Sequence, residues 1–425
     1  MTDARTAWFT HERFGLFVHY GLYSVAARHE WVANYERIDP AVYARYARYF
    51  DPDRFDAGAL ARAARATGAG YAVLTAKHHE GFCLWDTQTT TYSSAASVGR
   101  DLVREFVDAL RAEGLRVGLY FSLLDWAHPD YTIDRHHPQR GLPNVAELNA
   151  TRDMEVFRRY LREQLTELLA GYGPIDYLFF DFTEPAEADG LPGKGPQDWD
   201  AEALLALCRE LQPNMIVNDR LGIPADLVTP EQYQPARPLE HDGEPVLWEA
   251  CQTLNGSWGY HRDNLDFKSP DLVVRMLVGS VSLGGNLLLN VGPTARGEVA
   301  PRDATILRDV GGWVDLHERS IRGAGPSAWT PPSGVVYTQR EDRLYVHLFD
   351  WPFGLLHLPG LAGRVEFARL LHDGSEIAFA EIPADQEASI MVPAGPPAGT
   401  LTLTLPVQRP QVLVPVIELL LKEAR

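Results

Sequence analysis

Six short apolar runs, each followed closely by polar side chains, constrain the fold of this chain more than any other feature. The clearest run begins at Tyr71 and leads into Lys77, His78, His79 and Glu80. An apolar run of this length fits a strand that is buried on both faces, as in a parallel sheet. Ligands of α/β folds bind at the carboxyl ends of such strands, so the two histidines indicate a candidate site. Their position alone is equally consistent with a strand cap or a buried core histidine.

The other five runs end in the same way, and together they predict a barrel. They lead from Phe14 to His19, from Arg116 to Asp125, from Ile175 to Asp181, from Met215 to Asn218 and from Pro245 to Glu249. Strands that repeatedly finish in polar residues are typical of the catalytic rim of a (β/α)8-type barrel. The expected strands are 14–20, 71–77, 116–122, 175–181, 215–220, 245–250 and 286–290, and the expected helices include 101–113, 154–169, 198–211, 270–283 and 302–322. This alternation predicts an α/β fold, either a parallel barrel or a doubly wound sheet.

The pattern of apolar residues changes after Gly323. Short runs of often alternating apolar residues follow, separated by turn residues such as Pro359 and Gly360. The runs are 335–337, 343–347, 355–358, 364–367, 376–379, 389–392 and 400–405. This pattern is typical of an antiparallel β-sandwich. We therefore expect a catalytic barrel domain over 1–325 and a C-terminal β-sandwich domain over 326–425.

The charge of the chain argues against two classes of partner. A formal net charge of −18 over 425 residues disfavours binding to nucleic acid and to anionic membrane surfaces. No apolar segment approaches the roughly 18 residues of a membrane span, and the N-terminus lacks the basic and apolar regions of a secretory signal. The three cysteines, at 83, 208 and 251, have no metal-binding spacing. We expect a cytoplasmic protein, and the sequence leaves open whether it forms a homo-oligomer.

Carboxylates near the expected strand ends suit glycoside hydrolysis, which needs two carboxyl groups around the anomeric carbon. Asp181 follows an uncharged strand, where an ionised group is costly unless it is hydrogen-bonded or used. Glu231 lies in the long loop after the next expected strand. The residue pattern alone does not choose between these and the competing carboxylates Glu30, Glu80, Asp125, Asp219 and Glu249.

Histidines and tryptophans of the same regions suit the binding of a sugar. Imidazole groups can hydrogen-bond to ring hydroxyls, and the candidates are His19, His78 and His79. Indole rings can stack on the apolar face of a sugar, and the candidates are Trp31, Trp85, Trp126 and Trp258. Each tryptophan taken singly is more often a packing residue.

A metal-dependent barrel enzyme of the amidohydrolase type is the rival interpretation, because such barrels also use histidines at strand ends. Their sites usually take an HxH pair from one strand, together with further histidines and an aspartate. Here the first expected strand ends in His19 alone. The adjacent His78 and His79 would point to opposite faces of a regular strand. We therefore expect no metal and no cofactor, and sensitivity to a chelator would test this.

Eight segments of the chain, in the same order, resemble the α-L-fucosidases of glycoside hydrolase family 29. They are FGLFVHYGLYSV, EW, YAVLTAKHHEGFCLWDT, GLYFSLLDWAHPDY, VNDRLG, TPEQYQP, WEACQTLNGSWGY and GGNLLLNVGP, between about Trp8 and Gly297. The resemblance implies a retaining, exo-acting α-L-fucosidase that acts on fucosylated oligosaccharides or glycoconjugates. It also implies a barrel with a C-terminal β-sandwich. A fucose-binding protein without catalysis is the alternative from another class, and hydrolysis of an aryl α-L-fucoside separates the two.

The resemblance implies a catalytic pair. The family's nucleophile is an aspartate that ends a strand with a pattern like LWFDG, which matches Asp181. Phe179 and Phe182 stand where the family usually has tryptophan and glycine. The family's acid/base glutamate follows an NDR motif within a pattern like TPEQ, which matches Glu231. The chemistry of the pair requires a raised pKa for Glu231 and a low one for Asp181.

The resemblance also implies a set of substrate-binding residues. They are His19, Glu30, Trp31, His78, His79, Tyr120 and Arg220, to which we add the stacking candidate Trp258. Phe121 is an alternative match for the tyrosine of the third strand. If Glu231 were not the acid/base, we would assign that role to Glu249 first and to Glu30 second.

Overall fold

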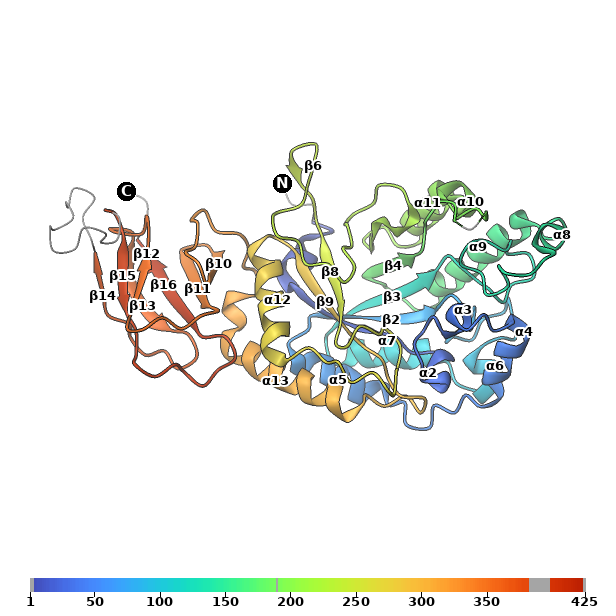
Figure 1. Ribbon diagram of the computed structural model, residues 1–425, viewed down its shortest axis with the longest axis horizontal. Helices are drawn as coiled ribbons and strands as arrows, with labels where there is room; N and C mark the ends of the chain where they lie inside the picture. The colour runs from blue at the N-terminus through green and yellow to red at the C-terminus, as the bar shows by residue number, and fades with distance from the viewer. Residues whose placement is uncertain (1–3, 189, 382–397, 423–425) are drawn as a thin grey trace.

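The computed structural model describes residues 4–188, 190–381 and 398–422. The molecule is elongated: antiparallel sheets form one end, and α3 (Val32–Tyr35) and α8 (Val145–Asn149) lie at the other (Figure 1). A parallel sheet wrapped by helices lies between them, so the predicted α/β class is confirmed. The expected strand 389–392 lies outside the described residues.

Seven parallel strands of the described residues form one curled sheet, in the order β5-β4-β3-β2-β1-β9-β8. They are β1 Phe14–Val18, β2 Tyr71–Lys77, β3 Arg116–Ser122, β4 Tyr177–Asp181, β5 Ile216–Val217, β8 Glu249–Thr253 and β9 Asn286–Val291. Each neighbouring pair is parallel. The carboxyl ends of the strands therefore meet on one rim, which is where barrels of this class place their sites.

The extended segment 227–231 takes the place of an eighth strand between the two edges of this sheet. Leu227 forms a parallel bridge with Asn218 just after β5, and Glu231 forms one with Cys251 in β8. The bridges are isolated, and a proline within the segment has no N–H with which to continue a ladder. The predicted (β/α)8-type barrel is thus present in an irregular form.

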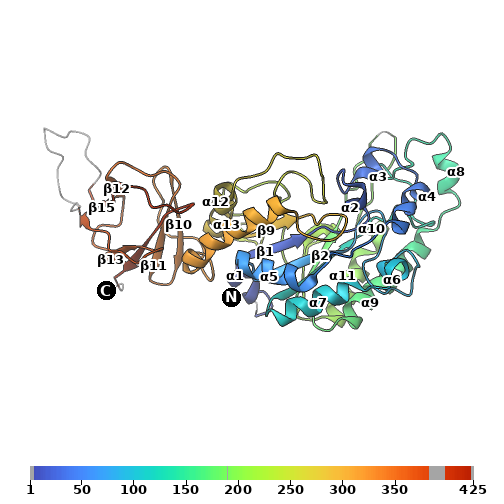
Figure 2. The same cartoon turned by 90° about the horizontal axis from the view of Figure 1, so that it is seen from below.

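The described helices all belong to the barrel part of the chain, and the longer ones pack around the outside of the sheet (Figure 2). In chain order they are α1 Ala7–Glu12, α2 Tyr23–Ala26, α3, α4 Pro40–Tyr43, η1 Ala44–Arg48, α5 Ala57–Thr67, α6 Ser94–Val98, α7 Leu102–Ala112, α8, α9 Met154–Gly171, α10 Pro196–Trp199, α11 Ala201–Leu211, η2 Asp219–Leu221, α12 Pro270–Ser282, α13 Pro301–His317 and η3 Glu318–Ser320. Several long helices begin where a side chain accepts a hydrogen bond from a free backbone N–H. The capping residues are Asp56, Asp101, Asp153 and Ser269, at α5, α7, α9 and α12.

Aromatic side chains fill the barrel from its amino-terminal end. Phe9 of α1 packs against Tyr71 and Tyr177 from β2 and β4. Phe17 and Phe179 continue this cluster toward the opposite rim. The amino-terminal end is therefore plugged, and the free space lies at the carboxyl rim.

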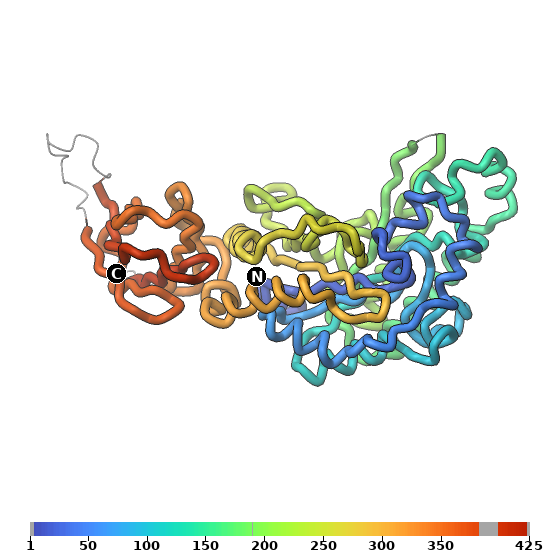
Figure 3. The backbone as a smooth tube through the Cα atoms, turned by 60° about the horizontal axis from the view of Figure 1, so that its bottom comes forward, coloured from blue at the N-terminus to red at the C-terminus, as the bar shows by residue number. Residues whose placement is uncertain are grey.

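Two antiparallel sheets follow the barrel and enclose a core of their own. The orange and red part of the backbone trace in Figure 3 is this region, at one end of the molecule. One sheet contains β10 Val335–Arg340, β11 Arg343–Leu348, β16 Val416–Leu421 and β13 Val365–Leu370, and the other contains β12 Leu355–Leu358, β15 Leu401–Thr404 and β14 Phe379–Glu381. This part packs on α12 and α13. Trp313 Nε1 donates to Val414 O at 2.7 Å, and Arg275 donates to Phe349 O at 2.8 Å.

Several expected elements begin, end or divide differently from the prediction, and the strand expected at 215–220 is reduced to β5 because η2 follows it. The helix expected at 198–211 is split into α10 and α11, because Asp200 between them has a φ of 57°. The strand expected at 245–250 begins only at Glu249, because a hairpin of β6 (Glu240–His241) and β7 (Glu244–Pro245) comes first. Glu249 is consequently at the start of its strand and not, as expected, at the end.

Candidate active site

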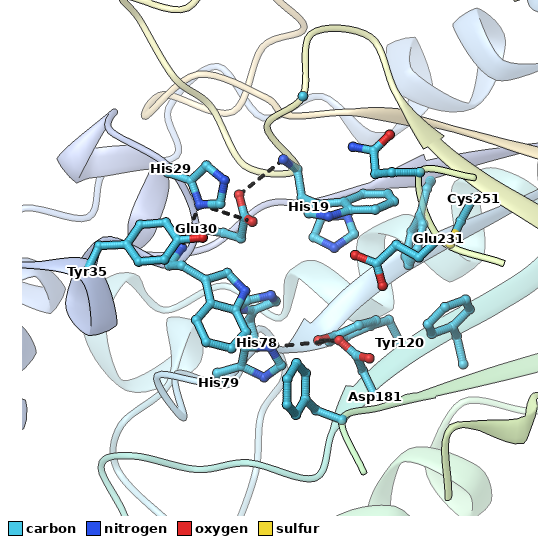
Figure 4. Close-up of a pocket in the computed structure, with 17 residues that line it drawn as sticks. His19, His29, Glu30, Tyr35, His78, His79, Tyr120, Asp181, Glu231 and Cys251 are labelled. Carbon is cyan, nitrogen blue, oxygen red and sulfur yellow. Dashed lines mark hydrogen bonds and ion pairs between the residues drawn. The ribbon is translucent and has the colours of Figure 1, made fainter. Parts of the chain in front are cut away.

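Side chains from the carboxyl rim converge on one pocket of about 310 Å³ (Figure 4). Its lining is Phe17, His19, His29, Glu30, Trp31, Tyr35, His78, His79, Tyr120, Phe179, Asp181, Phe182, Glu231, Gln232, Cys251, Gly256 and Trp258. All the predicted site residues except Arg220 are in this set. Arg220 does not line the pocket, but it donates hydrogen bonds to two residues that do, Asp181 and Glu231.

Asp181 is the last residue of β4 and faces the pocket. Phe179 lies on the same side of the strand, since alternate residues share a face. The Tyr120 hydroxyl donates to Asp181 Oδ2 at 2.8 Å, and Arg220 Nη1 donates to Oδ1 at 3.2 Å. Each carboxylate oxygen therefore has a donor that fixes its direction. Phe121, the alternative to Tyr120, lies in the outer core between sheet and helices.

Arg220 also brings Glu231 close to Asp181. The same Nη1 atom donates to Glu231 Oε2 at 3.0 Å, and Thr229 fixes the other guanidinium nitrogens. Each carboxylate is thus one hydrogen-bond length from the same nitrogen, and their bonded oxygens are at most two such lengths apart. This limit is compatible with the about 5–5.5 Å separation of retaining glycosidases. The Glu231 side chain is 42% exposed and that of Asp181 is 14% exposed. Glu231 is therefore nearer the solvent.

A neighbouring strand orients His19, which follows β1. His19 Nδ1 lies 2.6 Å from Oδ1 of Asn290 in β9. The Asn290 amide nitrogen donates to Trp258 O at 2.7 Å, so Oδ1 is the acceptor and His19 Nδ1 carries the proton. The Nε2 atom of His19 is left as an acceptor.

The paired histidines at the end of β2 both line the pocket, which the sequence argument did not expect. Their ring centroids are 4.1 Å apart. The expectation of opposite faces was wrong because β2 ends at Lys77 and a turn follows, in which Gly81 N donates to His78 O. Gly81 has a φ of 84°, and a Cβ there would lie 2.2 Å from Asp125 Oδ1. His79 Nδ1 lies 2.7 Å from Ser122 Oγ, whose own proton goes to Leu124 O.

Glu30 closes the wall opposite Asp181. Its Oε2 accepts from the backbone nitrogens of Trp258 and Gly259 at 3.1 and 2.9 Å. Its Oε1 is buried and accepts no hydrogen bond within the described part of the chain, although His29 Nδ1 lies 3.2 Å away. Trp31, the next residue, places its ring against His79 at 5.0 Å between centroids. The first strand end and the loop after α2 thus form one polar wall.

The other competing carboxylates have structural partners away from the pocket. Asp125 pairs with Lys77 at 3.3 Å, and Asp219 accepts from Thr229. Glu80 is buried 3.5 Å from His78 but does not line the pocket. Of the competing set, only Glu30 reaches the site.

Glu249, our first substitute for the acid/base, lies at the amino-terminal end of the barrel. The hydroxyls of Tyr71 and Tyr177 both donate to its carboxylate. A carboxyl group at the plugged end of the barrel cannot reach a sugar at the opposite rim. That substitute assignment was wrong, because the β6–β7 hairpin delays the start of β8.

A family model described as alpha-L-fucosidase matches residues 2–319. The chain belongs to the alpha-L-fucosidase family. It is 30% identical to the tissue alpha-L-fucosidase of Bos taurus, over 93% of this chain and 86% of that protein. It is also 30% identical to the plasma alpha-L-fucosidase of Homo sapiens, over 87% of this chain and 83% of that one.

Solved fucosidase structures share the whole architecture of this enzyme. Alpha-L-fucosidase isoenzyme 1 from Paenibacillus thiaminolyticus is 42% identical, has a TM-score of 0.89 and covers 99% of both chains. A glycoside hydrolase family 29 fucosidase from Bacteroides thetaiotaomicron, solved as a trapped covalent intermediate, is 26% identical with a TM-score of 0.83, over 99% of this chain and 97% of that one. The predictions of a glycoside hydrolase and of a retaining α-L-fucosidase are confirmed.

Burial sets the charge of several groups in the pocket of this fucosidase. It raises the pKa of Asp181 to about 6, against the opposing effect of Arg220, where the sequence argument expected a low value. It raises the pKa of Glu30 to about 8, and the N–H groups of Gly259 and Trp258 oppose it. It lowers the pKa of His78 to about 3. His19 and His79 are likewise held neutral, with the pKa of each well below the usual value.

Several residues of the fucosidase pocket were absent from the sequence prediction. They are Phe17, His29, Tyr35, Gln232, Cys251 and Gly256, while Phe179 and Phe182 were named only as departures from the family pattern. Phe17 could have been found from strand period, because it lies two residues before His19 on the same face. Predicting Cys251 in the pocket would require the correct register of β8, and predicting Tyr35 there would require the conformation of a loop. Neither has a local signal in the sequence.

The described residues contain neither a metal-binding cluster nor a membrane-spanning helix. No group of three or more His, Cys, Asp or Glu side chains is placed there to hold a metal ion. No helix among them is both long and apolar enough to span a bilayer.

Proposed function

We propose that this fucosidase removes terminal α-L-fucose with Asp181 as nucleophile and Glu231 as acid/base. The observation that carries the assignment is the single Arg220 nitrogen shared by the two carboxylates, at 3.2 and 3.0 Å. A positive charge between two carboxylates offsets their repulsion and keeps both beside one anomeric carbon. The proposed substrate is a fucosylated oligosaccharide or glycoconjugate.

The reaction proceeds in two displacements. In the first, an oxygen of Asp181 forms a bond to C1 while the bond from C1 to the leaving oxygen breaks, and Glu231 donates a proton to that oxygen. In the second, Glu231 takes a proton from water, the water oxygen bonds to C1, and Asp181 is released. Glu231 suits both proton transfers because its side chain is the more exposed. The leaving group and the water pass through the mouth of the pocket.

Polar atoms that line the pocket and lack a hydrogen-bond partner in the described part of the chain suit the hydroxyls of the sugar. With their Nδ1 protons used by Asn290 and Ser122, His19 and His79 offer Nε2 acceptors. Glu30 Oε1 is buried without a hydrogen bond among the described residues. Leaving such a group unpaired costs about 1–3 kcal/mol. A bound sugar would supply the missing partners.

An aromatic wall suits the methyl group at C5 of fucose. The rings of Phe17 and Phe179 are 5.1 Å apart, and Trp258 lies 5.9 Å from Phe17. This wall offers no hydrogen-bond acceptor for a hydroxymethyl group, so a sugar with an apolar C5 substituent is favoured there.

The assignments of domain boundary and location are also proposals. We place the boundary between residues 325 and 326, supported by the change from a parallel to antiparallel sheets and by the separate core of the second part. Cytoplasmic location remains a prediction from the sequence, which leaves open whether the protein forms a homo-oligomer. Cell fractionation and light scattering of the purified protein would test them.

Two alanine variants and azide test the catalytic pair. Asp181→Ala should lose nearly all activity, because no carboxylate remains to attack C1. Glu231→Ala should lose little activity on fucosides with good leaving groups and much more on those with poor ones, since only the latter need the proton. Azide should accelerate the Glu231 variant by attacking the glycosyl-enzyme and giving a product of retained configuration.

The outcome that rejects the assignment is equally specific. An equal loss in Glu231→Ala on good and poor leaving groups, together with no effect of azide, would remove Glu231 from its role. Because Glu249 lies at the far end of the barrel, Glu30 would then be the remaining candidate in the pocket.

A further inference from the structure

We infer that Gln232 is a positioning residue that fixes Glu231 through a paired hydrogen bond to Thr253. This inference rests on the proposed role of Glu231. Gln232 follows Glu231 directly and has a φ of 50°. A residue with a side chain rarely takes this left-handed conformation, and residues that do so gather at functional sites. The turn redirects the chain immediately after Glu231.

The side chain of Gln232 makes both of its hydrogen bonds to one residue of the rim. Its Nε2 donates to Thr253 Oγ1 at 2.6 Å, and its Oε1 accepts from Thr253 N at 3.2 Å. Its backbone nitrogen donates to Cys251 O at 3.0 Å. Thr253 ends β8 and is fully buried. Gln232 is therefore anchored to a rigid part of the barrel.

Glu231 requires such an anchor because burial does not hold it. Its side chain is 42% exposed, and among the described residues Arg220 is the only hydrogen-bond partner of its carboxylate. The backbone of Glu231 is joined to β8 only by an isolated bridge to Cys251. The bond pair of Gln232 ties the very next residue to the same strand. Two successive attachments limit the rotation of the segment that carries the carboxylate.

The same threonine joins the two sides of the pocket. Thr253 Oγ1 also accepts from Gly256 N at 2.7 Å, in the loop that leads to Trp258. The N–H groups of Trp258 and Gly259 hold Glu30. The position of Glu231 is thereby linked to the wall that receives the sugar hydroxyls.

Paired variants on both sides of the bond test this inference. Gln232→Gly removes the amide and leaves a residue that accepts a positive φ, and Thr253→Val removes the hydroxyl while keeping the shape. In each, kcat/KM for an alkyl α-L-fucoside should fall about tenfold more than for a dinitrophenyl α-L-fucoside, because misplacing an acid affects only poor leaving groups. Thr253→Ser should restore the wild-type ratio. The double variant should lose no more than the more affected of the two single variants, because Thr253→Val also removes the acceptor for Gly256 N.

Gln234→Gly is the matched control, and Glu231→Ala separates failure of this inference from failure of the proposed function. Gln234 lies in the same loop and donates to Ser280 Oγ and Met276 O of α12, so Gln234→Gly should leave the leaving-group ratio unchanged. Equal losses on both substrates in Gln232→Gly, or additive losses in the double variant, would overturn the inference. If Glu231→Ala itself showed no leaving-group dependence, the proposed function would have failed instead.

Discussion

The pKa of Asp181 is set by burial and by the charged and hydrogen-bonding residues around it. Its pKa is raised to about 6, and the hydrogen bond from Tyr120 is among the effects that hold it down. A nucleophile must be ionised, so kcat/KM should fall as the pH drops through about 6. Tyr120→Phe removes a donor to the charged form, which raises the pKa of Asp181 and moves this limb to higher pH. The measurement is the pH profile of kcat/KM.

The control for Tyr120→Phe is the same change on the next strand. Tyr177 donates to Glu249 at the other end of the barrel, so Tyr177→Phe should leave the acidic limb where it is. An acidic limb that stays in place in Tyr120→Phe would show that Asp181 does not control it.

Phe182 holds an unfavourable backbone conformation beside the nucleophile. Its φ is 97°, and its ring lies 4.7 Å from that of His136 and 5.4 Å from that of Trp31. Glycine accepts this φ freely and alanine does not, so Phe182→Gly should be more stable than Phe182→Ala by about 1 kcal/mol. This reverses the usual order of the two residues. Urea unfolding of the two variants measures the difference, and an alanine variant of equal or greater stability would contradict it.

At the scale of elements, the amino-terminal end of the barrel, here called its floor, holds a buried carboxyl group that has no part in the reaction at the carboxyl rim. The pKa of Glu249 is raised to about 8 by burial, so this carboxyl group is mostly protonated at neutral pH. Glu249→Gln keeps the shape, with a carbonyl acceptor for one of the two tyrosine hydroxyls and an amide donor to the other. We expect unchanged kcat and KM, with higher stability than wild type above pH 8, where the wild-type group would have to ionise. A large loss of kcat in this variant would contradict the separation of floor and rim.

Elements with a strong local pattern could be predicted from the sequence. β2 and β3 have the expected bounds because their apolar runs are continuous and begin and end sharply. The starts of α7 and α12 follow from the capping residues Asp101 and Ser269. The strand ends then indicated most of the pocket, because parallel strands deliver their last residues to one rim.

Elements fixed by distant partners could not be predicted in this way. The segment 227–231 has only two leading apolar residues, and it is extended because β5 and β8 flank it. Glu249 was misplaced because nothing local shows that a hairpin delays β8. His78 and His79 share the pocket because they lie in a turn after the last residue of β2, and the apolar run before them does not show how that turn directs their rings.

At the scale of the whole molecule, buried ionisable groups predict how stability depends on pH. Burial raises the pKa of Glu30, Glu80 and Glu249 from 4.5 to about 8. The folded state keeps these protons where the unfolded state has lost them. Their contribution to stability is therefore full below about 4.5 and is lost as the pH rises through 8.

Buried histidines act in the opposite direction. Burial lowers the pKa of His78, His137 and His347 from 6.5 to about 3. The unfolded state binds protons at these sites below 6.5 and the folded state does not, so stability falls as the pH drops from 6.5 toward 3. The two sets contain equal numbers of groups, so together they place the maximum Tm midway between 4.5 and 6.5, at about pH 5–6. Calorimetry between pH 4 and 9 would reveal this dome, and a Tm that rises steadily toward pH 9 would contradict it.

The closure of the barrel by isolated bridges has a consequence for the working temperature of the enzyme. Regions held by few backbone bonds open at a lower free energy than the fold as a whole. The segment 227–231 is such a region, and it carries Glu231. Warming should therefore stop turnover reversibly before far-ultraviolet circular dichroism changes, and a bound fucose analogue should narrow the gap between the two temperatures. If activity and the helical signal were lost at the same temperature, the segment 227–231 would be as stable as the rest of the barrel. If activity is lost first, this short segment sets the upper temperature limit of the enzyme.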